Sequence, residues 1–475
     1  MRGRRPSRRG GSSKQLVPDD SFSIDDEVSH LTKLSSQPTD STRRSLLGPR
    51  NKPLSLSSFK LLAGREGTGR FSLADRACVL GQHIPVRGPW YVDSMDSEAY
   101  VSRFSDDGSL FVVGFRGSHI RIYDVEKGWK VQKDISARSL RWTITDTALS
   151  TDQRYLAYAS LSPIVHVVNV QSGGTESCAN VTDVHESLDF SQGHSDYDDD
   201  YEHSFGIFSI KFSKDGREIV AGTNDDSIYV YDLFANKVSL RLLAHSADVN
   251  VVTFADETGH IIFSGSDDSL CKVWDRRCFT RDKPAGVLAG HLDGITHIDS
   301  RGDGRYLISN GKDQTIKLWD IRKMSSSVKF SIPRAYEWDY RCMVYPSEAR
   351  HMKHPHDQSL ATFRGHSVLR TLIRCYFSPA HSTGQKYIYT GSSDKCVYIY
   401  DIVSGEIAGK LGWHRSIIRD CSWHPHHQTL VSSAWDGYVV RWEASGDDDA
   451  DPLSLKSASQ KKQPDPERYR HPFEL

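Results

Sequence analysis

Short segments of alternating apolar and polar residues recur along the chain, and each ends in an aromatic or aliphatic residue followed by Asp, Asn or Glu. Alternation with a period of two is typical of a β-strand that buries one face. Seven such segments end in "IRIYD" (to Asp124), "VHVVN" (to Asn169), "IYVYD" (to Asp232), "CKVWD" (to Asp275), "IKLWD" (to Asp320), "VYIYD" (to Asp401) and "VVRWE" (to Glu443). Their ends are 45, 63, 43, 45, 81 and 42 residues apart, which predicts a β-repeat array with two insertions.

Two further landmarks recur in phase with these strand ends. A histidine opens four repeats, at positions His245, His291, His366 and His414. An aspartate stands six residues before the terminal aromatic residue in five repeats, at Asp225, Asp268, Asp313, Asp394 and Asp436. Aspartate suits a tight turn between two strands, because its carboxylate accepts hydrogen bonds from nearby backbone N–H groups.

These landmarks resemble the WD repeat, whose period is about 40–45 residues. The resemblance implies an all-β fold, a seven-bladed WD40-repeat β-propeller over residues 71–443. In this repeat the turn aspartate meets the opening histidine in a buried hydrogen-bond network, so we interpret these residues as structural and not as catalytic dyads. The first two repeats depart from the pattern, because Gly117 and Ser162 occupy the aspartate position. We expect the missing outer strand of the last blade within Phe71 to Val86, which would leave the ring no open sheet edge.

The terminal segments have a different composition. Residues 1–70 and 444–475 are polar and poor in aromatic residues, which predicts disorder. Within the first of them, a short helix is predicted over residues 24–34, with Ser23 and Asp26 as a capping box. Its apolar residues recur at helical spacing: Ile24, Val28, Leu31 and Leu34. Such a stripe needs a partner surface, unless the segment is only transiently helical.

The two long gaps between repeats are interpreted as insertions. Residues 171–203 are rich in Asp and Glu, which favours a solvated loop over a calcium site, because no Gly-punctuated ligand spacing is present. Residues 323–362 contain "YEWDYR", which imitates a strand end, but Ile332 stands where the turn aspartate belongs. Three histidines of this insertion could suggest a metal site: His351, His354 and His356. A surface loop is favoured instead, because they lie in a Pro-containing segment with no cysteine nearby.

Composition narrows the function classes. The formal net charge is −1, so the electrostatic footprint of a general nucleic-acid binder is missing. No apolar run approaches the roughly 18 residues of a membrane-spanning helix, the N-terminus lacks the apolar stretch of a secretory signal, and the eight cysteines form no Cys-x-x-Cys pair. "GREGTGRF" lacks the lysine and hydroxyl residue of a phosphate loop, and other catalytic motifs are missing. We therefore expect a soluble intracellular protein without enzymatic activity, cofactor or metal.

Two successive strand ends share an arginine two residues after Trp-Asp. These are "CKVWDRR", with Trp274, Asp275 and Arg277, and "IKLWDIR", with Trp319, Asp320 and Arg322. Such arginines suit a partner's carboxylates and carbonyls, although each one alone is readily explained by pairing with a nearby loop carboxylate.

The double Trp-Asp-x-Arg box resembles that of WD-repeat substrate receptors of cullin-4 RING ubiquitin ligases. The layout is similar to the plant LEC-fourteen-B type and to the animal receptor numbered eleven among the adaptor's associated factors. The resemblance implies that these six residues, with the helix containing Ile24 to Leu34, bind the damaged-DNA-binding adaptor protein of the ligase. It also implies a location in nucleus and cytoplasm. The alternative is a general WD-repeat scaffold in a chromatin or RNA-processing assembly.

The opposite face and its central opening are then expected to bind protein substrates. The candidates are side chains expected to be exposed beside the opening histidines and the turn aspartates, and most are Arg or Trp, which are frequent in binding hot spots. They are Arg116, Lys312, Arg364, Arg370, Trp413, Arg415 and Trp435, of which the last is equally well explained by packing between blades. No direct contact with nucleic acid or membrane is expected.

Overall fold

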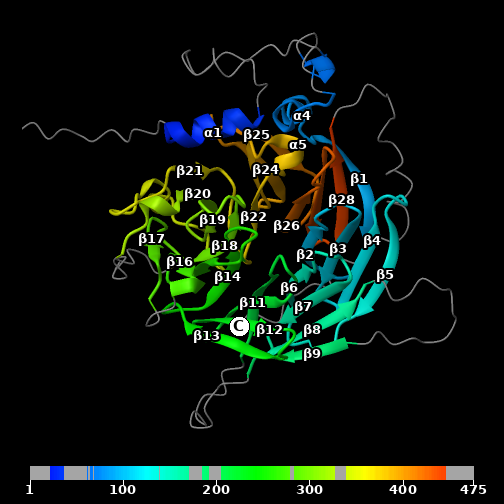
Figure 1. Ribbon diagram of the computed structural model, residues 1–475, viewed down its shortest axis with the longest axis vertical. Helices are drawn as coiled ribbons and strands as arrows, with labels where there is room; N and C mark the ends of the chain where they lie inside the picture. Colours follow the sequence, from blue (N-terminus) through cyan, green and yellow to red (C-terminus); the bar gives the residue numbers. More distant parts are fainter. Residues whose placement is uncertain are drawn as a thin grey trace, which may run out of the picture.

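Seven four-stranded antiparallel sheets surround a central axis, as Figure 1 shows for the computed structural model. The structure describes residues 22–36, 61–62, 65–67, 69–138, 140–170, 185–191, 205–278, 283–326 and 338–444. The predicted all-β, seven-bladed propeller is confirmed. The segments 1–21, 37–60 and 445–475, which hold most of the predicted disordered tails, lie outside the described residues.

The first four blades each follow the order of the chain from the inner to the outer strand. Blade 1 contains β2 (Ala99–Phe104), β3 (Leu110–Phe115), β4 (His119–Asp124) and β5 (Lys130–Ser136). Blade 2 contains β6 (Ile144–Leu149), β7 (Tyr155–Ser160), β8 (Ile164–Asn169) and β9 (His185–Asp189). Blade 3 contains β10 (Ile207–Phe212), β11 (Glu218–Thr223), β12 (Ser227–Asp232) and β13 (Lys237–Leu243). Blade 4 contains β14 (Val249–Phe254), β15 (Ile261–Ser266), β16 (Cys271–Asp275) and β17 (Gly286–Leu288).

The remaining blades complete the ring. Blade 5 contains β18 (Ile295–Ser300), β19 (Tyr306–Gly311), β20 (Thr315–Asp320) and β21 (Ala361–Arg364). Blade 6 contains β22 (Cys375–Phe377), β23 (Tyr387–Thr390), β24 (Cys396–Asp401) and β25 (Ile407–Gly412). Blade 7 contains β26 (Ile418–Trp423), β27 (Thr429–Ala434), β28 (Tyr438–Glu443) and, as its outer strand, β1 (Arg87–Ser94).

Closure of the ring differs from the sequence prediction in its position. The outer strand of blade 7 is β1, which pairs with β28, so the expectation of a closing strand within Phe71 to Val86 is wrong. Residues Leu73–Leu80 form helix α4 instead, because Ser72 and Asp75 make a reciprocal capping box at its start. The strand itself was hidden by Gly88 and Pro89, which weaken the strand pattern and accompany shifts in its register.

The first insertion is not one continuous loop. Strand β9 lies inside the predicted range 171–203 and supplies the outer strand of blade 2. Leu188 is 5% exposed and Phe190 is fully buried, so two apolar side chains are enough to anchor this acidic segment. Residues 171–184 and 192–204, and with them most of the acidic side chains, lie outside the described residues.

Helices are few and short in the described ranges. Those with described bounds are α1 (Asp26–Ser36), α4, α5 (Ala380–Thr383) and the 3-10 helices η1 (Arg276–Cys278), η2 (Ile321–Lys323) and η3 (Glu348–His351). None of these described helices is both long enough and apolar enough to span a bilayer.

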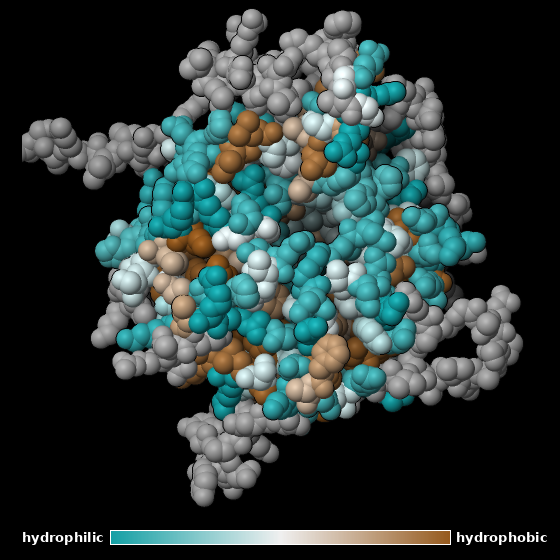
Figure 2. Space-filling view, viewed as in Figure 1, coloured by the Kyte–Doolittle hydropathy of each residue, from teal (hydrophilic) through white to brown (hydrophobic). Residues whose placement is uncertain are grey.

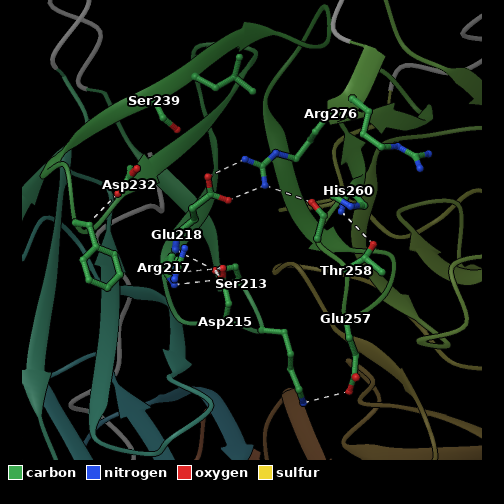
Figure 3. Close-up of a pocket in the computed structure, with 15 residues that line it drawn as sticks. Ser213, Asp215, Arg217, Glu218, Asp232, Ser239, Glu257, Thr258, His260 and Arg276 are labelled. Carbon is green, nitrogen blue, oxygen red and sulfur yellow. Dashed lines mark hydrogen bonds and ion pairs between the residues drawn. The ribbon is translucent and has the colours of Figure 1, made fainter.

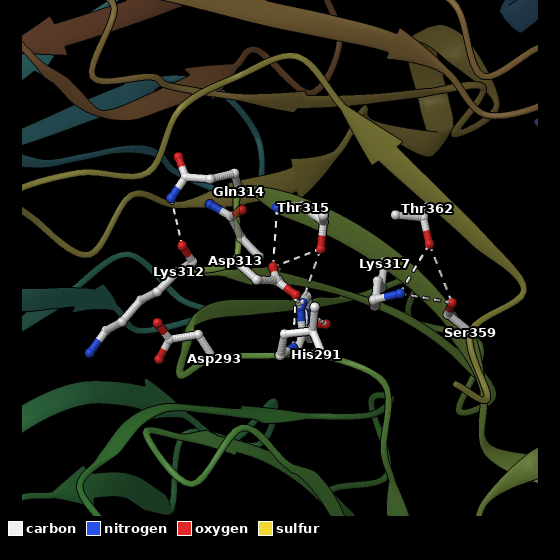
Figure 4. Close-up of polar contacts among 12 residues, drawn as sticks. His291, Asp293, Lys312, Asp313, Gln314, Thr315, Lys317, Ser359 and Thr362 are labelled. Carbon is white, nitrogen blue, oxygen red and sulfur yellow. Dashed lines mark hydrogen bonds and ion pairs between the residues drawn. The ribbon is translucent and has the colours of Figure 1, made fainter. Parts of the chain in front are cut away.

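The predicted histidine–aspartate networks are present in blades 4, 5 and 7. In blade 5, His291 Nδ1 lies 3.1 Å from the Asp313 carboxylate (Figure 4). His291 Nε2 lies 2.6 Å from Ser309 Oγ, which also accepts the indole N–H of Trp319. The same bonds join His245 to Asp268 and His414 to Asp436. These groups are buried and mutually satisfied, which supports a structural role.

Blade 6 departs from this network. A tyrosine stands at the Trp position, and the Tyr400 hydroxyl lies 3.1 Å from His366 Nδ1, where the aspartate would bind. Asp394 accepts a hydrogen bond from Tyr398 instead, at 2.6 Å. In blade 3, Asp225 likewise accepts a hydrogen bond from Tyr229, at 2.6 Å. The expectation of a histidine partner for Asp394 is therefore wrong.

Acidification is expected to destabilise the ring through His366. Burial lowers the pKa of His366 to about 4, whereas an unfolded histidine titrates near about 6.5. The unfolded chain therefore binds a proton that the folded ring excludes, and stability falls as the pH drops through this window. From pH 7 to pH 5 this one group should remove about 2 kcal/mol, measurable as a lower urea midpoint.

The variant His366→Gln supplies the comparison for this effect. Burial raises the pKa of Asp299 to about 6. Protonation of this carboxyl on acidification therefore stabilises the folded state, and in the wild type it offsets part of the stability lost through His366. His366→Gln should therefore lose less stability than the wild type between the two pH values. Equal losses would contradict this assignment.

Candidate functional site

The antiparallel strands give the propeller two faces. The third strand of each blade ends at one of them, which we call the box face, and η1 and η2 lie there. The turns between second and third strands lie at the opposite face, which we call the turn face, and Asp268 and Asp313 lie there. The predicted adaptor and substrate residues divide between these faces.

On the box face, Arg277 is fixed by the aspartate of its own Trp-Asp pair. Asp275 Oδ1 accepts the Arg277 backbone N–H at 3.0 Å and Nε at 2.9 Å, and Oδ2 accepts Nη2 at 2.8 Å. Hydrogen bonding by Arg277 lowers the pKa of Asp275 to about 2. The arginine side chain is still 59% exposed, so the two-residue offset produces a preformed fork that faces solvent.

Arg322 is held in the same way and also contacts helix α1. Asp320 Oδ1 accepts its backbone N–H at 2.9 Å, and Arg322 Nη2 donates to Glu27 Oε2 at 2.6 Å. Arg305 bridges the same two carboxylates, at 2.7 Å to Glu27 and 2.8 Å to Asp320. Both Arg277 and Arg322 therefore pair with nearby carboxylates, as the alternative interpretation of the sequence suggested. The Arg322 side chain nevertheless remains 56% exposed.

Helix α1 is seated on the ring between blades 5 and 6. Val28 is 1% exposed within the core cluster of these blades, and the Phe22 ring lies 5.4 Å from that of Phe363. Ile24 and Leu31 pack against the same cluster, whereas Leu34 is 40% exposed. A helix is present where one was predicted, but it spans Asp26–Ser36 and not 24–34, and the ring itself covers most of its apolar stripe.

The start of α1 differs from the predicted capping box. Asp25 Oδ1, and not Ser23, accepts the backbone N–H of Glu27, at 3.0 Å. Asp25 also pairs with Lys323 of η2 at 2.8 Å. The acidic first turn thus joins the helix to the box turn of blade 5.

The equivalent turn of blade 3 carries an aromatic residue. Phe234 stands two residues after Asp232, whose Oδ1 accepts its backbone N–H at 2.9 Å, as in the two box turns. Phe234 is 81% exposed. A cleft of about 910 Å³ separates it from Arg277, and Arg276 and Glu218 pair inside this cleft at 2.6 and 2.8 Å (Figure 3). Blades 3, 4 and 5 therefore present Phe234, Arg277 and Arg322 in a row.

Apolar side chains are also exposed where the two helices meet. Leu73 and Val79 of α4 are 65% and 38% exposed, close to α1 in the fold. Figure 2 shows apolar surface in this region of the molecule, over α1 and α4. The helices thus extend the box face with a surface suited to a protein partner.

The two box tryptophans are not available for contact. Trp274 and Trp319 are at most 1% exposed, and their indole N–H groups donate to Ser264 and Ser309 at 2.9 and 2.7 Å. They fix the strand ends that carry Asp275 and Asp320. Any part they play in docking is therefore indirect.

The predicted substrate residues have different environments on the turn face. Lys312 is 5% exposed and donates to Asp267 at 2.8 Å, so the expectation that it is exposed is wrong. Trp435 stacks on Tyr100 at 5.5 Å, which supports the packing interpretation. Trp413 is 37% exposed, and the four arginines are exposed: Arg116, Arg364, Arg370 and Arg415. Two of these contact other groups, because Arg116 pairs with Glu98 and Arg364 donates to the Arg350 carbonyl.

The central opening is crossed by charged side chains. Arg374, in the blade 6 segment before β22, pairs with Asp146 on β6 at 2.9 Å and with Asp420 on β26 at 3.4 Å. Burial opposes the ionised form of Asp146, but Arg374 and Lys211 hold its pKa far below the usual value. Because blades 6 and 2 lie on opposite sides of the ring, this network spans the opening that the sequence suggested for substrate.

Metal binding gains no support in the described ranges, where no group of three or more His, Cys, Asp or Glu residues is placed to hold an ion. His354 of the second insertion is 5% exposed, and its Nδ1 accepts the backbone N–H of His356. That contact is structural.

The comparisons with known proteins agree with this geometry. Five segments match the family described as "WD domain, G-beta repeat", at residues 199–232, 236–275, 282–320, 357–401 and 405–443. The chain is 60% identical to the LEC14B homolog of Prunus armeniaca over 95% of both chains, and 62% identical to the LEC14B protein of Lithospermum erythrorhizon over 90% of both. It is 37% identical to the "DDB1- and CUL4-associated factor 11 homolog" of Caenorhabditis elegans, over 83% of this chain and 70% of that one.

The chain belongs to the LEC14B and DDB1- and CUL4-associated factor 11 family of WD-repeat proteins. The five matched repeats of this LEC14B-type chain correspond to blades 3 to 7. Blades 1 and 2 form the same sheets without the landmarks, since Gly117 and Ser162 replace the turn aspartate.

Sequence reasoning missed several residues of this LEC14B-type site. Glu27 lies inside the predicted helix but was given no role, because an acidic first turn is already explained by the helix dipole. Phe234 could have been found from the sequence, because it stands two residues after Asp232, as Arg277 and Arg322 stand two residues after their aspartates. The pairing of Arg374 with Asp146 has no local signal, because the two residues are joined only by ring closure.

Proposed function

We propose that the protein is a non-catalytic substrate receptor that links target proteins to a cullin-4 RING ubiquitin ligase through DDB1, the damaged-DNA-binding adaptor. The name of the Caenorhabditis elegans relative supports this assignment. The observation that carries it is the row on the box face, where two arginines in adjacent blades are held as exposed forks beside the seated helix α1. We place the receptor in the nucleus and cytoplasm.

Affinity purification of the full chain with mass spectrometry tests this function. DDB1 and cullin-4 should be recovered together with the bait. Recovery of a chromatin or RNA-processing assembly without either of them would replace the receptor function with that of a general scaffold, which has the same fold.

Phe234 is expected to be a third contact for DDB1. Its ring is exposed at the position that the arginines occupy in the next two blades, and an exposed aromatic residue at an interface supplies apolar contact area. Phe234→Ala should weaken binding to DDB1 about tenfold, or about 1.4 kcal/mol, measured by isothermal titration calorimetry.

The control for this substitution is Leu243→Ala. Leu243 is 66% exposed and ends β13 at the turn face of the same blade. It should bind DDB1 like the wild type. An equal loss in both variants would remove Phe234 from the proposed interface.

A further inference from the structure

The turn face carries three exposed arginines and an exposed tryptophan. Arg141 directly precedes Trp142 in the segment between β5 and β6, while Arg370 and Arg415 lie in the segments before β22 and β26. All three are exposed. Among the described residues, their guanidinium groups have no hydrogen-bond or ion-pair partner, unlike that of Arg116. They are therefore available to a ligand.

An apolar seam connects these arginines. Trp142 is 57% exposed, and its ring lies 5.8 Å from that of Tyr100, which stacks on Trp435. Trp435 in turn packs against Val368, Ile373 and Ile417, and these residues flank the two other arginines in sequence: Arg370 and Arg415. Trp142 has a φ of 72°, a backbone conformation that is costly for a bulky residue and tends to occur at ligand sites. The seam thus runs across blades 6, 7, 1 and 2.

The other half of the turn face carries a cluster of carboxylates, of which Asp267 is paired with Lys312. Four of them lie in the turns and loops of blades 3 to 5: Asp226, Asp248, Asp267 and Asp293. Burial and neighbouring carboxylates raise the pKa of three of them: Asp226, Asp248 and Asp293. An extended anion would be repelled there, whereas a short acidic segment can remain on the arginine half.

We infer that the exposed Trp142 ring and the arginines above this largely buried seam bind a substrate segment that carries carboxylates beside a large apolar side chain. Unpaired arginine forks are matched by carboxylates, and the exposed Trp142 ring is matched by an apolar or aromatic side chain. This inference rests on the proposed receptor function, because it assigns the class of substrate. A single-stranded nucleic acid would also use arginine and aromatic groups, but its phosphates continue along the strand toward the acidic half.

Fluorescence anisotropy with defined probes tests the inference on the full chain. The probes are a labelled peptide of alternating glutamate and leucine around a central tryptophan, the same peptide with lysine for glutamate, and oligouridine. The acidic peptide should bind tightest, and its affinity should fall as salt is added. Failure of the acidic peptide to bind, or tighter binding of either other probe, would overturn the inference.

Variants locate the binding site. Arg141→Glu with Arg415→Glu should weaken binding of the acidic peptide at least about tenfold, and Trp142→Ala should do the same. The matched control is Arg217→Glu, because Arg217 is an exposed arginine that lines the cleft on the box face. This variant should bind the acidic peptide as tightly as the wild type does. Binding that is equally strong in all variants would overturn the inference.

The affinity of the same variants for DDB1 separates this inference from the proposed function. The turn-face variants should bind DDB1 like the wild type. If the wild type itself does not bind DDB1 but the peptide result holds, the receptor function is wrong and the acidic-segment site stands. If DDB1 binds and the peptide does not, only the site is wrong.

Discussion

Replacing Arg277 and Arg322 together with alanine is expected to reduce the affinity for DDB1 by roughly a thousandfold. Desolvated interface arginines cost about 2 kcal/mol or more on truncation, which is about thirtyfold each. Both side chains are more than half exposed and preformed by their aspartates, so little ordering entropy opposes their use. Surface plasmon resonance with purified DDB1 measures the change.

Of the two single substitutions, Arg322→Ala should reduce the affinity for DDB1 more than Arg277→Ala. It removes one fork and also one of the two arginines that hold Glu27, so that helix α1 is seated less firmly. The melting temperature should hardly change, because exposed substitutions usually alter stability by about 0.5 kcal/mol or less.

Arg341→Ala is the control for the box arginines. Asp339 Oδ1 accepts the Arg341 backbone N–H at 2.8 Å, as in the true boxes, but this turn lies at the turn face, where Tyr340 covers Lys312. Its binding to DDB1 should equal that of the wild type. Undiminished binding by the double variant at Arg277 and Arg322 would contradict the docking surface.

Replacing Arg374 with methionine is expected to cost about 3–5 kcal/mol of folding stability. The substitution removes the guanidinium that pairs with two buried carboxylates, Asp146 and Asp420, and breaking a buried ion pair from one side is strongly destabilising. Lys211, 3.9 Å from Asp146, compensates only that one carboxylate. It also breaks a link between opposite sides of the ring. Urea-induced unfolding followed by tryptophan fluorescence should show a clearly lower midpoint.

A double-mutant cycle distinguishes lost charge pairing from lost packing. Asp146→Asn in the Arg374→Met background removes one stranded charge, so the combined loss should be smaller than the sum of the two single losses. Strict additivity would show that the pair is not coupled across the central opening. Arg217→Met, at an exposed arginine, should leave the midpoint unchanged.

The repeat architecture could be predicted because every strand end repeats the same local pattern. Trp274 and Trp319 each close an alternating strand, and the turn aspartates lie at a fixed offset, so period and fold follow from local sequence. The closing strand could not be placed in this way. Its sequence, "RGPWYVDS", has a broken alternation, and only pairing with β28 makes it a strand.

The site was predictable where a turn is self-contained. Arg277 is fixed by Asp275 within three residues, so its position follows from the sequence alone. Contacts between segments that are distant in the sequence left no local signal. Examples are the hydrogen bond from Arg322 to Glu27 and the ion pair of Arg374 with Asp146. The burial of Lys312 was missed for the same reason, since its partner Asp267 comes from the neighbouring blade.

Hydrogen–deuterium exchange of the full chain with and without DDB1 tests the proposed receptor function most directly. The box face should be protected on binding, at α1, Arg276–Cys278 and Ile321–Lys323, together with the turn that carries Phe234. The turn face, including Trp142, should exchange as in the free protein. Protection of the turn face instead, or no protection at saturating DDB1, would contradict the assignment of the box face to the ligase.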